Sequence, residues 1–62
     1  MDIFEFAIEM EHEGEQYYRD IAAKTPHKGL QTILRRLADD EKKHARVISE
    51  LQTAIPDMPP CP

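Results

Sequence analysis

The chain has 62 residues and a formal net charge of −4, and 32% of its residues are charged. This acidic balance argues against nucleic acid as a partner, and no apolar run is long enough for a membrane span or a secretory signal. Cys61 is the only cysteine, so no intrachain disulfide can form, and we expect a reducing, cytoplasmic location.

The first predicted element is a helix over residues 3–24. Asp2, with Glu5 three residues later, has the sequence of a helix N-cap and its capping-box partner. Two oppositely charged pairs at four-residue spacing support the helix further: Glu15 with Arg19 and Asp20 with Lys24.

Thr25-Pro26 separates this helix from a second predicted helix over residues 27–53. We expect Thr25 to be the N-cap of the second helix and Pro26 to take its first position. Residues 55–62 hold four of the five prolines and are predicted to be a tail or linker. The predicted fold is therefore all-α, an antiparallel two-helix hairpin over residues 1–54.

The two predicted helices carry opposite net charges. Residues 1–24 hold seven acidic and two basic residues, a net of −5, and residues 28–54 hold six basic and four acidic residues, a net of +2. This difference favours antiparallel helices lying side by side. Two helices alone bury too little surface to be stable, so we expect a second copy, a bound metal or further chain to complete the core.

Both predicted helices carry an apolar stripe that ionisable residues interrupt near its middle. Alternate steps of three and four along the first helix give Phe4, Ala7, Glu11, Gly14, Tyr18 and Ile21. The same steps along the second give Leu30, Leu34, Leu37, Glu41, His44, Ile48 and Leu51. A charged carboxylate in a helix interface is costly unless it is paired or bound to a metal. Glu11, Glu41 and His44 are therefore candidate metal ligands.

The three candidate ligands are expected at one height of the hairpin. If the chain turns near residue 26, residues whose numbers sum to about 52 lie level, as Glu11 and Glu41 do. His44 lies one turn after Glu41 on the same face. A lone Glu-x-x-His more often faces solvent, so this placement is what favours a metal. His12 and His27 are expected to be solvated.

Two hairpins related by a two-fold axis would bring together four glutamates and two histidines. Four carboxylate charges balance two divalent ions, and this oxygen-rich ligand set suits iron or manganese, with zinc or cobalt as substitutes. Di-iron carboxylate bundles use the same arrangement, a Glu from each of two helices and a Glu-x-x-His from each of the other two.

The residues around these ligands resemble the rubrerythrin-like branch of the ferritin-like superfamily. The matching segments cover roughly residues 3–51: Ala7-Ile8-Glu9-Met10-Glu11, Tyr17-Tyr18 and Leu37-Ala38-Asp39-Asp40-Glu41-Lys42-Lys43-His44. The resemblance implies half of a four-helix bundle that dimerisation completes. It also implies that Glu11, Glu41 and His44 bind iron, two ions per dimer, with Tyr18 packed near the site as a candidate catalytic residue.

The single hairpin is similar to encapsulated ferritins, in which two chains share a di-iron site that oxidises Fe(II). Ordinary rubrerythrins carry both helix pairs in one chain together with a rubredoxin module, and neither occurs within these 62 residues. The resemblance thus implies a ferroxidase that is a homodimer or a higher homo-oligomer. An encapsulin shell is a further candidate partner, although no shell-targeting peptide is recognisable in the tail.

Three alternatives to a ferroxidase remain open from the sequence. The first is a peroxide reductase of the rubrerythrin type. The second is a non-catalytic helical dimerisation module, and the third is the N-terminal piece of a larger ferritin-like protein.

Overall fold

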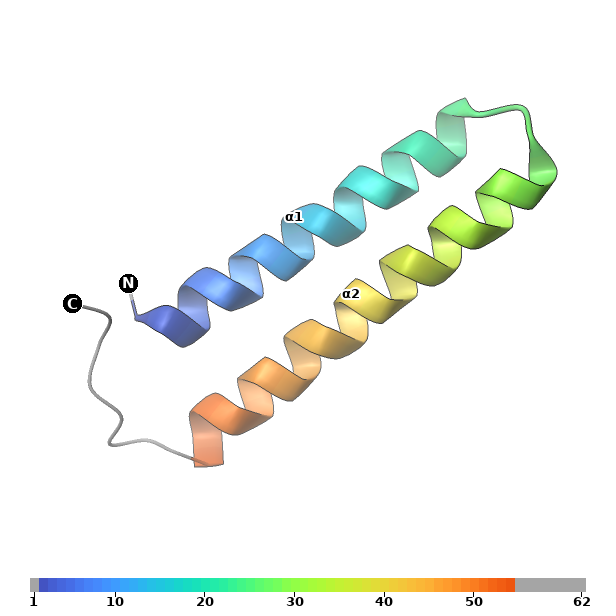
Figure 1. Ribbon diagram of the computed structural model, residues 1–62. Helices are drawn as coiled ribbons and strands as arrows, with labels where there is room; N and C mark the ends of the chain where they lie inside the picture. Colours follow the sequence, from blue (N-terminus) through green and yellow to red (C-terminus); the bar gives the residue numbers. More distant parts are fainter. Residues whose placement is uncertain (1, 55–62) are drawn as a thin grey trace.

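Two helices lie antiparallel along their length in the computed structural model, which describes residues 2–54 (Figure 1). Helix α1 covers Ile3–Lys24 and helix α2 covers Lys28–Ala54. The hairpin measures 47 × 19 × 11 Å, so it is a single layer about one helix thick. This arrangement confirms the predicted all-α hairpin. The predicted tail and Cys61 lie outside the described residues.

Asp2 caps the start of α1 as the sequence predicts. Its Oδ1 accepts a hydrogen bond from the Glu5 backbone N–H at 2.8 Å, which satisfies one of the free donors of the first turn. Its Oδ2 accepts a bond of 3.4 Å from Gln52 Nε2 near the end of α2. One side chain therefore caps one helix and ties it to the other.

The turn between the helices corrects one expectation from the sequence, because His27 rather than Thr25 caps α2. Nδ1 of His27 accepts a hydrogen bond from the Leu30 N–H at 3.1 Å, and its carbonyl accepts the Gln31 N–H at 2.9 Å. Thr25 instead has extended backbone angles and ends α1, as expected of a residue that precedes a proline. Its hydroxyl accepts the His27 N–H at 3.3 Å, so it supports the capping residue.

Arg19 links the two helices through charged hydrogen bonds. Its Nε donates to Glu15 Oε2 at 2.9 Å, and its Nη2 donates to Asp39 Oδ1 on α2 at 2.9 Å. The predicted Glu15–Arg19 pair is thus present. Within residues 2–54 no ion pair joins Asp20 to Lys24, and Asp20 accepts a hydrogen bond from Gln16.

Small side chains form the contact between the helices. The buried residues of the described hairpin are Ala22, Leu34, Ala38 and Ala45. Alanine lets two helix backbones approach closely, but it contributes little apolar surface to a core. The hairpin therefore brings its helices together without enclosing a core of large side chains.

The large apolar side chains form what we call the apolar face, one side of the hairpin that nothing covers. Each of its members is at least 38% exposed: Ile3, Phe6, Met10 and Tyr17 on α1, and Leu30, Ile33, Leu37, Val47 and Leu51 on α2. Helical spacing places both sets on the same side of the hairpin. A contiguous apolar surface of this kind marks an interaction site.

Neither α1 nor α2 has a segment long and apolar enough to cross a membrane.

We predict that His27→Ala destabilises the metal-free protein by about 1 kcal/mol, the usual cost of losing an N-cap side chain. His27→Asp is the matched control, because its carboxylate oxygen can accept the same hydrogen bond as Nδ1 of His27, and it should melt no lower than the wild type. Thermal unfolding followed by circular dichroism measures both variants. Equal losses of stability in the two variants would contradict the capping role.

Candidate metal centre

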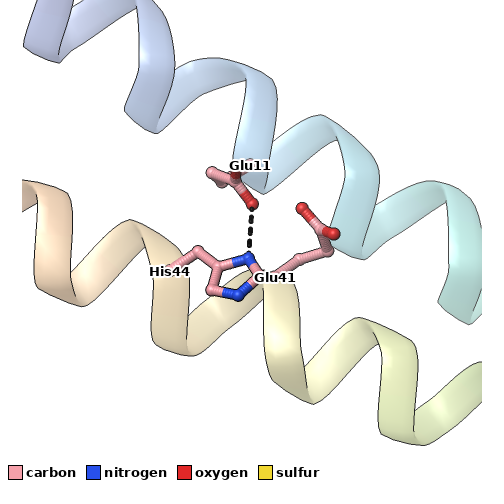
Figure 2. Close-up of side chains that lie close together, drawn as sticks. All are labelled: Glu11, Glu41 and His44. Carbon is pink, nitrogen blue, oxygen red and sulfur yellow. Dashed lines mark ion pairs between the residues drawn. The ribbon is translucent and has the colours of Figure 1, made fainter.

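Glu11, Glu41 and His44 meet between the two helices, about midway along the hairpin (Figure 2). Each offers a ligand atom, and these atoms all lie within 4.8 Å of one another. Glu11 comes from α1 and the other two from successive turns of α2, so the antiparallel pairing of the helices creates the cluster. The structure thus brings together the three predicted ligands, and their role in binding a metal stays a prediction.

The carboxylate of Glu11 has a buried oxygen that no hydrogen bond satisfies. Its Oε2 is shielded from solvent and has no hydrogen-bond partner in the described chain. Nδ1 of His44 lies 3.4 Å away, within ion-pair range but without hydrogen-bond geometry, and the His44 side chain is 60% exposed. An unsatisfied buried oxygen is costly, so this oxygen is suited to a hydrogen-bond donor or a cation.

The carboxylate of Glu41 lies against both Glu11 and the backbone of α1. The pKa of Glu41 is raised, because protonated Glu41 can donate a hydrogen bond to the carboxylate of Glu11; burial and the Glu11 charge raise this pKa further, while His44 acts in the opposite direction. A charged Glu11 thus opposes the ionisation of Glu41. On its other side, the Glu41 side chain occupies space left open by Gly14, one turn after Glu11 on α1.

Comparison with known proteins gives one family. The family model described as Rubrerythrin matches residues 2–57, nearly the whole chain. This chain belongs to the rubrerythrin family. Rubrerythrins generally bind iron, which agrees with the chemistry of the carboxylate and imidazole cluster. No curated protein and no solved structure matches the chain significantly.

The cluster of this rubrerythrin-family chain fits a cation of the iron type. Two carboxylates and one imidazole form the oxygen-rich set with one nitrogen that iron and manganese accept. The buried Glu11 oxygen without a partner and the raised pKa of Glu41 are both features that a bound cation would relieve. One hairpin offers three candidate ligands, so a cation held there would have room for further ligands.

His12 and His27 lie outside the cluster. His27 caps α2, as described above. His12 lines a groove on the other side of the hairpin, together with Lys42, Arg46 and Ser49 of α2. Lys43 also lines this groove, and three cationic side chains at its wall disfavour a metal cation there. The chemistry of a metal site therefore favours the cluster of Glu11, Glu41 and His44 over this groove.

Tyr18 is half-buried on the same stripe as Glu11, and its nearest aromatic neighbour is Tyr17. The two ring centroids lie 5.9 Å apart, and the ring planes are tilted by 58°. Such tilted contacts stabilise packing. A catalytic role for Tyr18 stays a prediction.

Sequence reasoning assigned no role to Gly14, although it placed this residue on the apolar stripe. The sequence does contain an indication of this role: Gly14 is a glycine in a helix interior, on the face that packs against the other helix, and such a glycine usually has a packing or functional reason. Arg19 was likewise expected to pair within α1, and its second bond to Asp39 was missed. A charge pair between helices depends on the relative rotation of the helices, which the sequence did not supply.

The raised pKa of Glu41 predicts a pH dependence of stability. The folded protein binds the carboxyl proton of Glu41 more tightly than the unfolded chain does. Protonation of Glu41 therefore stabilises the fold, and this contribution is fully present below the ordinary pKa of 4.5. It is lost as the pH rises through the folded pKa. Glu41→Gln cannot lose this contribution, so the metal-free variant should melt increasingly above the wild type between about pH 4 and pH 7.

Thermal melts of both proteins in chelator across this range test the effect. Glu13→Gln is the matched control, because Glu13 is an exposed acid on α1, and its melting difference from the wild type should not change with pH. A constant difference for Glu41→Gln would contradict the opposition between the two acids.

Proposed function

We propose that this protein is a di-iron ferroxidase whose site is shared between two copies of the hairpin. The observation that carries the proposal is the convergence of Glu11, Glu41 and His44 around a buried oxygen without a partner. Membership of the rubrerythrin family supports iron as the metal. A cytoplasmic location is part of the proposal, and a chain with one cysteine is compatible with it.

The uncovered apolar face supports dimerisation through the side of the hairpin that carries the site. Its exposed members lie on α1 and α2 on the side toward which His44 projects. A second hairpin packed there by a two-fold axis would cover these side chains and complete a four-helix bundle. The same operation would bring four glutamates and two histidines together, the number of carboxylate charges that two divalent ions balance.

In the proposed reaction, two Fe(II) ions each lose one electron. Dioxygen takes up these two electrons and two protons and leaves as hydrogen peroxide. When bound, the iron supplies the electrons. The carboxylates of Glu11 and Glu41 and the imidazole of His44 from each chain would hold the ions, and the carboxylates would neutralise the added positive charge.

Burial of the site against the second hairpin shapes this chemistry. The low dielectric of a closed bundle strengthens the attraction between carboxylates and cations. Tyr18, half-buried beside the stripe, would help to exclude water from the site. The hairpin thus contributes ligands, charge balance and shielding.

A peroxide reductase and a non-catalytic helical module are the competing functions. A peroxide reductase would use the same ligands. The two functions are separated by comparing how fast dioxygen and hydrogen peroxide oxidise the bound Fe(II): faster oxidation by peroxide would indicate a peroxide reductase. A helical module would use the apolar face alone, and it would dimerise equally well with and without metal.

We predict that Glu11→Gln and Glu41→Gln each abolish Fe(II) oxidation while the metal-free proteins melt no lower than the wild type. Glutamine keeps the size and helix propensity of the side chain but removes the charge that a metal needs, and it relieves the opposition between the two acids. Oxidation is followed by absorbance after aerobic addition of Fe(II). Glu13→Gln should oxidise iron at the wild-type rate.

Unchanged oxidation in both variants would rule out the proposed site. Loss of stability in both, without any metal dependence, would indicate instead that the acids have a purely structural role.

We also predict that metal shifts the protein from hairpin to dimer, with one ion per chain. Binding to the assembled state alone stabilises that state, and the metal-free bundle would hold four carboxylates close together. Solution mass by light scattering, with and without chelator, combined with elemental analysis of protein prepared without a histidine tag, measures both quantities. His44→Gln should weaken the shift and His12→Gln should not. A dimer of equal stability with and without metal would contradict a shared site.

A further inference from the structure

Gly14 faces the side chain of Glu41 so closely that a larger residue would displace it. A Cβ built on Gly14 would lie 3.2 Å from Oε2 of Glu41, 3.5 Å from its Cδ and 3.6 Å from its Cγ. The first distance is shorter than ordinary van der Waals contact. Any side chain at this position would therefore push the carboxylate away from the surface of α1.

The backbone gives no other reason for a glycine at this position. No glycine of the described chain has a positive φ, and Gly14 lies in the interior of α1. Glycine in a helix interior is less favourable than alanine. The close approach of the Glu41 carboxylate is the feature that requires glycine here.

We propose that Gly14 is a positioning residue for the metal centre, and the inference rests on the metal binding proposed above. The missing side chain lets Glu41 lie beside α1, with its carboxylate near the carboxylate of Glu11 and the imidazole of His44; the ligand atoms of the three residues lie within 4.8 Å of one another. Metal–ligand distances tolerate errors of only a few tenths of an ångström. A shift of the Glu41 carboxylate by a Cβ at position 14 would therefore weaken its bond to a shared cation.

The test is Gly14→Ala, titrated with Co(II), whose visible absorption reports the geometry of its ligands. We expect the Co(II) affinity to fall by about tenfold or more, the usual effect of disturbing the surroundings of a metal ligand, and the absorption bands to shift. The metal-free variant should melt at or above the wild-type temperature, since alanine favours the helix. A merely structural role for Gly14 would lower this melting temperature.

Gly29→Ala is the matched control. It makes the same chemical change in the first turn of α2, where the added methyl group would meet the ring of His27 instead of Glu41. Its Co(II) affinity and spectrum should equal those of the wild type.

A second measurement separates an effect through Glu41 from an effect on the packing of two hairpins. In a Glu41→Asp background the acidic side chain is one methylene shorter, so its carboxylate oxygens lie farther from a Cβ on residue 14. Gly14→Ala should then reduce Co(II) affinity less than it does in the wild type. An equal loss in both backgrounds would overturn the proposal, and so would an unchanged affinity and spectrum for Gly14→Ala alone. Absence of Co(II) and Fe(II) binding by the wild-type protein would instead overturn the proposed function itself.

Discussion

The placement of two carboxylates against each other between two helices is the constraint on which the rest of this structure depends. Glu11 and Glu41 occupy positions that the helical period assigns to core residues, and each raises the electrostatic cost of the other. Apolar residues at these positions would give a more stable hairpin. A cation between the glutamates would remove their repulsion and would satisfy the buried oxygen of Glu11.

Small residues around each glutamate make this close approach possible. Ala38 and Ala45 are buried one turn before and one turn after Glu41, and Ala7 and Gly14 hold the equivalent places around Glu11. Side chains of this size bring the helix axes together, which carries the carboxylates into one small volume. The same choice leaves little apolar surface between the helices, so the large side chains lie on the exposed face. These small residues therefore explain both the close approach of the three candidate ligands and the exposure of the large apolar side chains.

The sequence was sufficient to predict the elements of the fold and the residues that meet. Helical periodicity and the Thr25-Pro26 break predict two helices of similar length. Because the turn between them is short, the two helices pair antiparallel. Counting residues from that turn is then enough to bring Glu11 level with Glu41. The details that escaped prediction depend on side-chain conformations. Whether Thr25 or His27 caps α2 depends on which side chain turns back toward the free N–H groups, and the contact at Gly14 depends on which way Glu41 folds.

Metal binding and assembly would be coupled in the proposed dimer, because the same side of the hairpin carries both the candidate ligands and the uncovered apolar residues. An isolated hairpin would offer a metal three ligands in an exposed setting, where water competes for the cation. A metal-free dimer would bury the apolar face but would also bring four carboxylates together in a low dielectric. Each process thus removes the main obstacle to the other, and thermodynamic linkage requires the two effects to be equal in free energy. Because the described hairpin buries few large apolar side chains, this coupling would let metal binding favour the proposed dimer.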